Sequence, residues 1–352
     1  MPTIDPPALR EFVERIFVAT GSPAGDADAV ATHLVEANLK GHDSHGVIRV
    51  QQYVDGAQAG RIQPGATTDT ESETETTAVL NGNWNYGQVV ARDTMAKAIE
   101  KAQASGVGIV VAHQAAHAGR IGAYGEQATR AGMIAIACVT VHGGGQLVAP
   151  FGGAARRLST NPLVVAAPTN DPDAPFVLDM ATSMGAEGKV RVARNRGAQL
   201  APDWILDGEG NPTTDPWDLY GGDPPGSRSA GALLPVGGPV GHKGFGLSMA
   251  VELLAGALTP AGTVGPDPKR AGNALFMLAF DPNRFVGAAP FSDALSGLVE
   301  YVKSPPFAPG FDEVLTAGEP ERRRMAQRQQ DGIPLDEATW EQIGSAADTV
   351  GV

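Results

Sequence analysis

The 352-residue sequence contains a single cysteine, Cys138, which excludes a disulfide within the chain and a cysteine-based zinc cluster. No apolar segment approaches the roughly twenty residues that span a bilayer, and the first residues lack the charged and apolar regions of a secretory signal. Basic side chains are few, because 26 Lys and Arg face 39 Asp and Glu and give a net charge of −13. Such a surface repels nucleic-acid phosphates and anionic lipids. We therefore expect a cytoplasmic protein that binds neither nucleic acid nor membrane.

The usual nucleotide-binding motifs are also absent. Although the chain holds 45 glycines, none are spaced as G-x-G-x-x-G between a strand and a helix, or as G-x-x-x-x-G-K-[ST]. A standard Rossmann fold is therefore not indicated. The 42% of apolar and 18% of charged residues are typical of a globular chain, and the length allows two or three domains.

Hydrophobic periodicity predicts a mixed α/β chain with helices at both ends. Residues 63–77, rich in Thr and Glu, read as a polar linker, and the Pro- and Gly-rich stretches 202–241 and 259–272 read as long loops. The predicted organisation is a helical unit of residues 1–65 and 310–352, and an α/β core of residues 75–309 with room for two subdomains. Helices are expected at about 6–20, 26–39, 88–104, 121–131, 185–194 and 244–258, in the charged segment after Glu319 and around Trp340, and strands at 107–112, 133–141, 163–167, 176–180 and 274–280.

The stretch from Gly41 to Arg49 carries a possible acid/base group and an anion-binding group. Ser44 is a favourable N-cap, so a helix is expected to begin at His45, with Arg49 one turn further on the same face. The positive end of the helix dipole would hold the His45 imidazole neutral. The Arg49 guanidinium could bind a carboxylate through two parallel hydrogen bonds. The alternative is that both are solvated surface residues.

Three further stretches offer polar groups beside apolar strands. His117 follows the strand at 107–112, at the edge where open α/β sheets place ligands. Thr160 lies in a turn that could supply neutral donors to a ligand. Asp179 falls within an apolar strand, where a carboxylate needs a partner, and His45 and His117 are candidates for that partner. The alternatives are an ordinary loop hydrogen bond, a tight turn and a structural salt bridge.

Two stretches before predicted helices are suited to an anionic ligand. Thr182 and Ser183 precede the helix expected from Gly185 and offer hydroxyl and free N–H groups suited to a phosphate. Lys243, with His242 beside it, is bracketed by glycines that allow close approach to a phosphate or carboxylate. Glycine could equally mark close helix packing.

Taken in order, these motifs resemble the type-2 malate/L-lactate dehydrogenase family, which also includes sulfolactate and ureidoglycolate dehydrogenases and a cyclic-imine reductase. The similarity runs from about residue 5 to 345. It is carried by Ser44-His45-Gly46-Val47 with Arg49, Thr160-Asn161-Pro162, Leu178 to Ser183, Gly241 to Leu247 and Gly318-Glu319-Pro320.

The resemblance implies a non-Rossmann NAD(P)-binding fold with a mixed sheet, and a homodimer with contacts from the helical unit. His45 matches a proton donor and His117 a general base of some members; we rank His45 first because Arg49 stands beside it. Ser44 and Thr160 are assigned with Arg49 to the substrate. Asp179 is assigned both a catalytic role and a contact to the cofactor. The other expected cofactor contacts are Met180, Ala181, Thr182, Ser183, His242, Lys243, Gly318, Glu319 and Pro320.

The expected activity is hydride transfer between NAD or NADP and C2 of a small 2-hydroxy or 2-oxo acid. In this hypothesis His45 exchanges the proton, Arg49 holds the carboxylate and Asp179 stabilises the imidazolium. An NAD(P)H-dependent cyclic-imine reductase is the nearest alternative. From other classes, a metal-dependent hydrolase that uses His42, Asp43 and His45, and a binding module without turnover, stay open.

Overall fold

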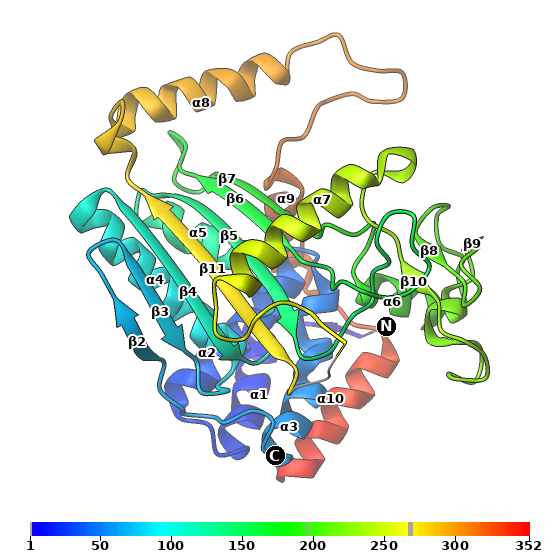
Figure 1. The fold of residues 1–352 in the computed structure, drawn as a ribbon. Helices are drawn as coiled ribbons and strands as arrows, with labels where there is room; N and C mark the ends of the chain where they lie inside the picture. Colours follow the sequence, from blue (N-terminus) through cyan, green and yellow to red (C-terminus); the bar gives the residue numbers. More distant parts are fainter. Residues whose placement is uncertain (1, 196, 267–269) are drawn as a thin grey trace. The chain divides into compact units, whose positions relative to one another are not determined.

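The computed structural model describes residues 2–195, 197–266 and 270–352 (Figure 1). The chain forms two compact units. One contains Met1–Ala137, Val164–Asp179 and Met277–Val352, and the other contains Cys138–Leu163 and Met180–Phe276. None of the helices in the described ranges combines the length and the apolar run needed to cross a membrane.

The helices at the two ends of the chain share one core in the first unit. Asp5 caps the helix α1 (Pro6–Ala19), as predicted, because its carboxylate accepts the Ala8 N–H at 3.2 Å. The strands β1 (Thr3–Ile4) and β12 (Ile333–Pro334) pair antiparallel and so join the two ends. The helices are α1 (Pro6–Ala19), α2 (Ala24–Leu39), α3 (Val50–Gln58), α9 (Glu319–Asp331) and α10 (Glu337–Val350), and their shared core includes Leu9, Phe17, Leu34, Tyr53 and Ile343.

A seven-stranded mixed sheet confirms the predicted α/β class (Figure 1). The strands β2 (Asp69–Glu73) and β3 (Thr77–Asn81) are antiparallel, whereas β3 and β4 (Val107–Ala115) are parallel. The helix α4 (Gly87–Ser105) packs on β4 and on α5 (Gly122–Arg130). In order across the sheet, the strands are β2 (Asp69–Glu73), β3 (Thr77–Asn81), β4 (Val107–Ala115), β11 (Gly272–Phe280), β5 (Ile134–His142), β6 (Leu163–Ala167) and β7 (Phe176–Met180).

Part of the expected polar linker is therefore the strand β2. All five of its side chains are exposed, so it lacks the apolar alternation that predicts a strand. The helix α8 (Ala288–Val302) was also not expected, and Ser292 is its only buried residue among those described.

The second unit has its own small core around short elements. It contains α6 (Glu187–Asn195), the two-residue strands β8 (Ile205–Leu206), β9 (Pro212–Thr213) and β10 (Ala232–Leu233), and α7 (His242–Val251), which continues as a π-helix over Glu252–Ala257. These strands lie inside the stretch expected to be a long loop. Two residues are too few to give a periodic signal.

Candidate active site

The segment that carries His45 is not the α-helix predicted from Ser44. Residues 43–45 and 47–49 form two short 3-10 turns, and α3 begins only at Val50. Asn38 explains the difference, because its side-chain oxygen accepts the Val47 N–H at 2.8 Å and its amide donates to Asp43 at 2.8 Å. A Cβ on Gly46 would lie 2.0 Å from that oxygen. The backbone of Gly46 is extended, with φ −91° and ψ −151°, so the predicted helix start at His45 is wrong.

Two imidazole rings lie face to face in the first unit. The ring centroids of His45 and His117 are 5.6 Å apart and their planes differ by 21°. Burial is the main cause that lowers the pKa of His45 well below its ordinary value, and the charges of His117 and Arg49 lower it further. Burial, followed by Arg49 and His33, lowers the pKa of His117 to about 3. Both rings are thus neutral at pH 7, as predicted for His45, but burial rather than a helix dipole is responsible.

Ser44 and Arg49 lie beside this pair. The Ser44 hydroxyl is 2.9 Å from Nδ1 of His45, which fixes the orientation of that ring. The guanidinium of Arg49 donates from Nε to the Ser44 carbonyl at 2.8 Å and from Nη1 to Gln52 at 2.9 Å. A bound carboxylate would therefore compete with Gln52 for Arg49.

His117 lies just beyond the end of β4, as predicted, and two side chains that the sequence reasoning missed hold it there. The hydroxyl of Tyr53, from α3, is 2.6 Å from Nδ1 of His117. Gln88, from α4, donates its amide to that hydroxyl at 2.9 Å. Tyr53 and Gln88 occupy buried positions of helices, so in sequence they are indistinguishable from core residues.

Two further side chains hold the loop that follows His117. His33, from α2, accepts the backbone N–H of Arg120 at 2.8 Å. The hydroxyl of Tyr124, from α5, donates to the Ala118 carbonyl at 2.6 Å and its ring stacks on His33. The loop is therefore fixed by helices from distant parts of the sequence.

Asp179 lies in β7 as predicted, and its partner is the backbone rather than an imidazole. Its carboxylate accepts the Gly122 N–H, at the start of α5, at 2.8 Å. Within the described ranges, no hydrogen bond or ion pair joins Asp179 to His45 or His117. A Cβ on Gly122 would lie 2.5 Å from Nη1 of Arg120 and 2.7 Å from Oδ2 of Asp179, so glycine leaves both side chains room to approach α5.

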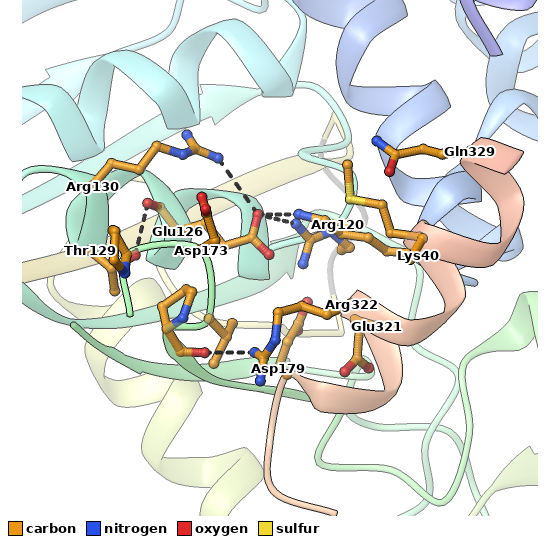
Figure 2. A pocket seen from close by; sticks show the side chains of 16 residues that line it. Lys40, Arg120, Glu126, Thr129, Arg130, Asp173, Asp179, Glu321, Arg322 and Gln329 are labelled. Atoms are coloured by element: carbon orange, nitrogen blue, oxygen red, sulfur yellow. Dashed lines mark hydrogen bonds and ion pairs between the residues drawn. The ribbon is translucent and has the colours of Figure 1, made fainter. Parts of the chain in front are cut away.

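A cavity of about 510 Å³ opens beside Asp179 in the same unit (Figure 2). Its lining includes Arg120, Lys40 and Glu126, and the Glu126 carboxylate pairs with Arg120 at 2.8 Å and with Lys40 at 2.5 Å. These two cations lower the pKa of Glu126 against the opposing effect of its burial. Arg322 also lines the cavity and donates to the Pro175 carbonyl at 2.9 Å. The described lining residues thus carry both charges, with four basic side chains (Lys40, Arg120, Arg130 and Arg322) and four acidic ones (Glu126, Asp173, Asp179 and Glu321).

Gly318, Glu319 and Pro320 form the start of α9, and only Gly318 lines this cavity. Gly318 has φ +91°, and a Cβ there would lie 2.9 Å from Nη1 of Arg322. The Glu319 carboxylate accepts the Thr316 N–H at 2.8 Å and pairs with Lys303. Pro320 lies in the first helical turn, where its missing N–H costs nothing.

The remaining predicted site residues lie in the second unit. The N–H of Thr182 donates to the Thr160 carbonyl at 3.0 Å, so these two segments are adjacent. The hydroxyl groups of Thr182 and Ser183 donate to backbone carbonyls of Asn161 and Gly185, at 3.0 and 2.8 Å. The helix expected from Gly185 begins at Glu187 instead. Met180 and Ala181 are half-buried, and His242 and Lys243 are exposed in the first turn of α7.

A buried polar cluster that the sequence reasoning missed supports the Thr160 turn. Asn161 has φ +37° and donates its amide to the Glu252 carboxylate at 2.9 Å. Thr140 donates to the same oxygen, and the Val264 N–H donates to the other at 3.1 Å. These bonds stabilise the left-handed backbone at Asn161, which an L-residue adopts only at a cost.

The residues proposed for the alternative metal site, His42, Asp43 and His45, each contact a different side chain. Asp43 accepts from Asn38 and pairs with Arg328 at 2.6 Å, and His42 faces Glu321 at 3.4 Å. In the part of the chain that the structure describes, no three His, Cys, Asp or Glu side chains are grouped to hold a metal ion.

The geometry is that of an α/β protein with a neutral imidazole pair, and comparisons with known proteins give its family. The family model for malate/L-lactate dehydrogenase matches residues 4–344. The chain therefore belongs to the malate/L-lactate dehydrogenase family, a family of oxidoreductases.

Individual relatives agree with this assignment. The malate dehydrogenase of Pyrococcus horikoshii is 37% identical over 98% of this chain and 94% of its own, and its solved structure superposes with a TM-score of 0.87 at 35% identity, covering 100% of this chain and 96% of that one. The L-lactate dehydrogenase of Cupriavidus necator is 36% identical over 98% of this chain and 97% of its own. The structure of delta1-piperideine-2-carboxylate reductase from Pseudomonas syringae is similar with a TM-score of 0.80 at 26% identity, covering 99% of this chain and 100% of that one.

Proposed function

We propose that this chain transfers a hydride between NAD or NADP and C2 of a small 2-hydroxy or 2-oxo acid. The observation that carries the proposal is the stacked pair of neutral imidazoles, His45 and His117, with the charge of Arg49 close enough to lower the pKa of both. A proton exchanger beside a guanidinium is what reduction of a 2-oxo acid requires.

In the reducing direction, the carbonyl carbon gains a hydride and its oxygen gains a proton, which gives the 2-hydroxy acid. Arg49 binds the substrate carboxylate in place of Gln52 and so orients the carbonyl. Burial is the main cause of the lowered pKa of His45, but that carboxylate offsets the charge of Arg49, a lesser cause, and so favours the proton that the ring must carry in the complex. His45, held through Nδ1 by Ser44, delivers this proton to the developing alkoxide.

We propose that the dinucleotide binds beside Asp179. The cavity of about 510 Å³ has both basic and acidic side chains in its lining; its basic residues, which include Arg120, Lys40 and Arg322, are the proposed contacts to the phosphates, and Gly318 allows close approach of the backbone. When bound, the nicotinamide supplies or accepts the hydride. The chain's contacts to it are proposed to be Asp179, Met180, Ala181, Thr182, Ser183, His242, Lys243, Gly318, Glu319 and Pro320, and Thr160 to be a contact to the substrate.

A panel of small 2-oxo acids and cyclic imines, each offered with NADH and with NADPH, tests the proposal directly. We expect oxidation of reduced nicotinamide with at least one oxo acid, and His45→Ala to lower kcat by about a hundredfold or more while cofactor affinity is retained. Unchanged turnover in the variant would remove His45 from this role. Cyclic imines are the second candidate substrates, because a solved reductase of a cyclic imine acid has a similar structure. Turnover of imines alone would favour that alternative.

A homodimer is proposed from apolar side chains in the segment from α8 to α9. Leu298, Tyr301 and Phe311 are 55%, 77% and 69% exposed. Exposed apolar side chains in such number are typical of a surface that another chain covers. The sequence predicted contacts from the terminal helical unit; α8 lies outside that range, and Phe311 lies within it. A cytoplasmic location remains a prediction of the sequence.

A further inference from the structure

The side chains that hold His117 form a chain of hydrogen bonds with one direction. Gln88 donates from Nε2 to the Tyr53 hydroxyl at 2.9 Å, and that hydroxyl lies 2.6 Å from Nδ1 of His117. The other acceptor within reach of Tyr53 is the His117 carbonyl, at the longer distance of 3.4 Å. Which atom donates at each step decides the protonation of the imidazole.

The orientation of the Gln88 amide sets that direction. As placed, the buried Gln88 amide leaves one carbonyl oxygen, Oε1, without a hydrogen-bond partner. In this orientation Nε2 is the amide atom that faces the Tyr53 hydroxyl, at 2.9 Å. Gln88 therefore donates to Tyr53.

The single hydrogen of the Tyr53 hydroxyl then goes to Nδ1 of His117. Burial raises the pKa of Tyr53 to about 12, so the hydroxyl keeps this hydrogen. The lowered pKa of His117 keeps the ring neutral, with one N–H only. Because Nδ1 accepts, that hydrogen must be on Nε2.

We propose that Tyr53 and Gln88 are positioning residues that hold His117 as its Nε2–H tautomer, which makes His117 a fixed hydrogen-bond donor to the bound acid and leaves proton transfer to His45. The catalytic half of this inference rests on the proposed function. In this arrangement His117 cannot act as a base, because Nδ1 already accepts the Tyr53 hydrogen and Nε2 already carries one. Protonation of His117 is also disfavoured while His45 carries a proton, because the two ring centroids are only 5.6 Å apart.

Packing makes the arrangement rigid. Tyr53 and Gln88 are 1% and 2% exposed, and the rings of Phe17 and Tyr86 each lie 6.3 Å from that of Tyr53. The ring of Tyr53 is therefore held among other buried rings, which keeps its oxygen beside the imidazole. Donors fixed in this way act without reorganisation when a substrate binds.

Nitrogen-15 NMR of the histidine-labelled protein without substrate measures the tautomer directly. We expect Nδ1 of His117 to resonate in the range of an unprotonated ring nitrogen and Nε2 in that of a protonated one. The spectrum of His117→Asn identifies the resonances. The opposite assignment, or an equal mixture of the two tautomers, overturns the proposal. This experiment needs no turnover, so it decides the tautomer even if the proposed activity fails.

A matched pair of variants tests the role in catalysis. Tyr53→Phe keeps the buried ring but removes the hydrogen that Nδ1 accepts. Tyr86→Phe removes the hydroxyl of a neighbouring buried tyrosine that instead contacts Ser22 at 3.0 Å. We expect Tyr53→Phe to raise KM for the oxo acid by about tenfold, as when one hydrogen bond is weakened, with the pH midpoint of kcat unchanged. Tyr86→Phe should change neither.

Two kinetic results would contradict the inference. If Tyr53→Phe shifts the pH midpoint of kcat, His117 takes part in proton transfer. If Tyr53→Phe and Tyr86→Phe have equal effects on KM, the hydroxyl of Tyr53 serves only to fill the core.

Discussion

Acid should destabilise this protein through His33, a buried base that must be neutral in the fold. Nε2 of His33 accepts the backbone N–H of Arg120 at 2.8 Å, and because an amide N–H can only donate, this nitrogen carries no hydrogen. Burial first, and then the charges of Arg120 and Lys40, lower the pKa of His33 to about 3, against the opposing charge of Glu126. Protonation would break the bond to Arg120 and place a charge in a buried site.

The size of the effect follows from the two pKa values. In the unfolded chain His33 titrates near its ordinary value of 6.5, so between that value and about 3 the unfolded state binds one more proton. The contribution of His33 to the free energy of unfolding is fully present above this pH window. It is lost as the pH drops through the window, by about 1.4 kcal/mol for each pH unit. Between about pH 7.5 and about pH 5.5, His33 alone should account for a loss of about 1.4 kcal/mol.

Urea unfolding of the parent protein and of His33→Gln at these two values isolates the contribution. Glutamine can accept the Arg120 N–H but does not titrate. The variant also loses the stacking of His33 on Tyr124, whose centroids lie 5.7 Å apart, but this loss is nearly the same at both pH values and cancels in the difference. We expect the parent to lose about 1.4 kcal/mol more than the variant on acidification. Equal losses, or a larger loss in the variant, would refute the reasoning.

Three further outcomes are expected. Arg49→Lys keeps the charge but loses the planar fork, so KM for the oxo acid should rise by about tenfold or more; a fall in cofactor affinity alone would contradict this. Glu126→Gln leaves Lys40 and Arg120 buried without their carboxylate and should lower the free energy of unfolding by about 3 kcal/mol, measured in urea. Leu298→Asp should shift the mass in sedimentation from dimer to monomer, and an unchanged mass would place the interface elsewhere.

The parts of the fold that the sequence could predict are those set by local chemistry. Asp5, which is followed by two prolines, caps α1 as expected, because an N-cap depends only on residues next to it in sequence. The bounds of β6 and β7 match the predicted ones. β6 lies between β5 and β7 and is a continuous apolar run, whereas β7 is at the edge of the sheet and its apolar run Phe176–Leu178 precedes Asp179.

The segment around His45 could not be predicted in this way. Its turns are set by Asn38 from α2 and by Arg328 from α9, which pairs with Asp43. Arg328 is hundreds of residues away in sequence, so no local pattern reports it. The N-cap signal of Ser44 was real but weaker than these contacts; its hydroxyl bonds the His45 ring instead.

The same distinction holds for the candidate site. His45, Arg49 and His117 stand out because polar groups beside apolar runs need an explanation. Tyr53 and Gln88 do not, because each occupies a helix position that a core residue would also fill. Only the hydrogen bonds from Gln88 to Tyr53 and between Tyr53 and His117 distinguish their polar atoms from those of ordinary buried side chains.

The placement of His117 therefore depends on residues outside its own motif. Asp179 was expected to stabilise an imidazolium, yet its carboxylate holds the start of α5 at Gly122. Together with the bond from the Arg120 N–H to His33, this fixes the backbone amides of Arg120 and Gly122. Gly119 has φ +72°, and a Cβ there would lie 2.3 Å from Nε2 of His33, so a larger residue would displace the ring that holds the loop. A loop fixed at this many points can hold an imidazole in one tautomer, whereas a mobile one could not.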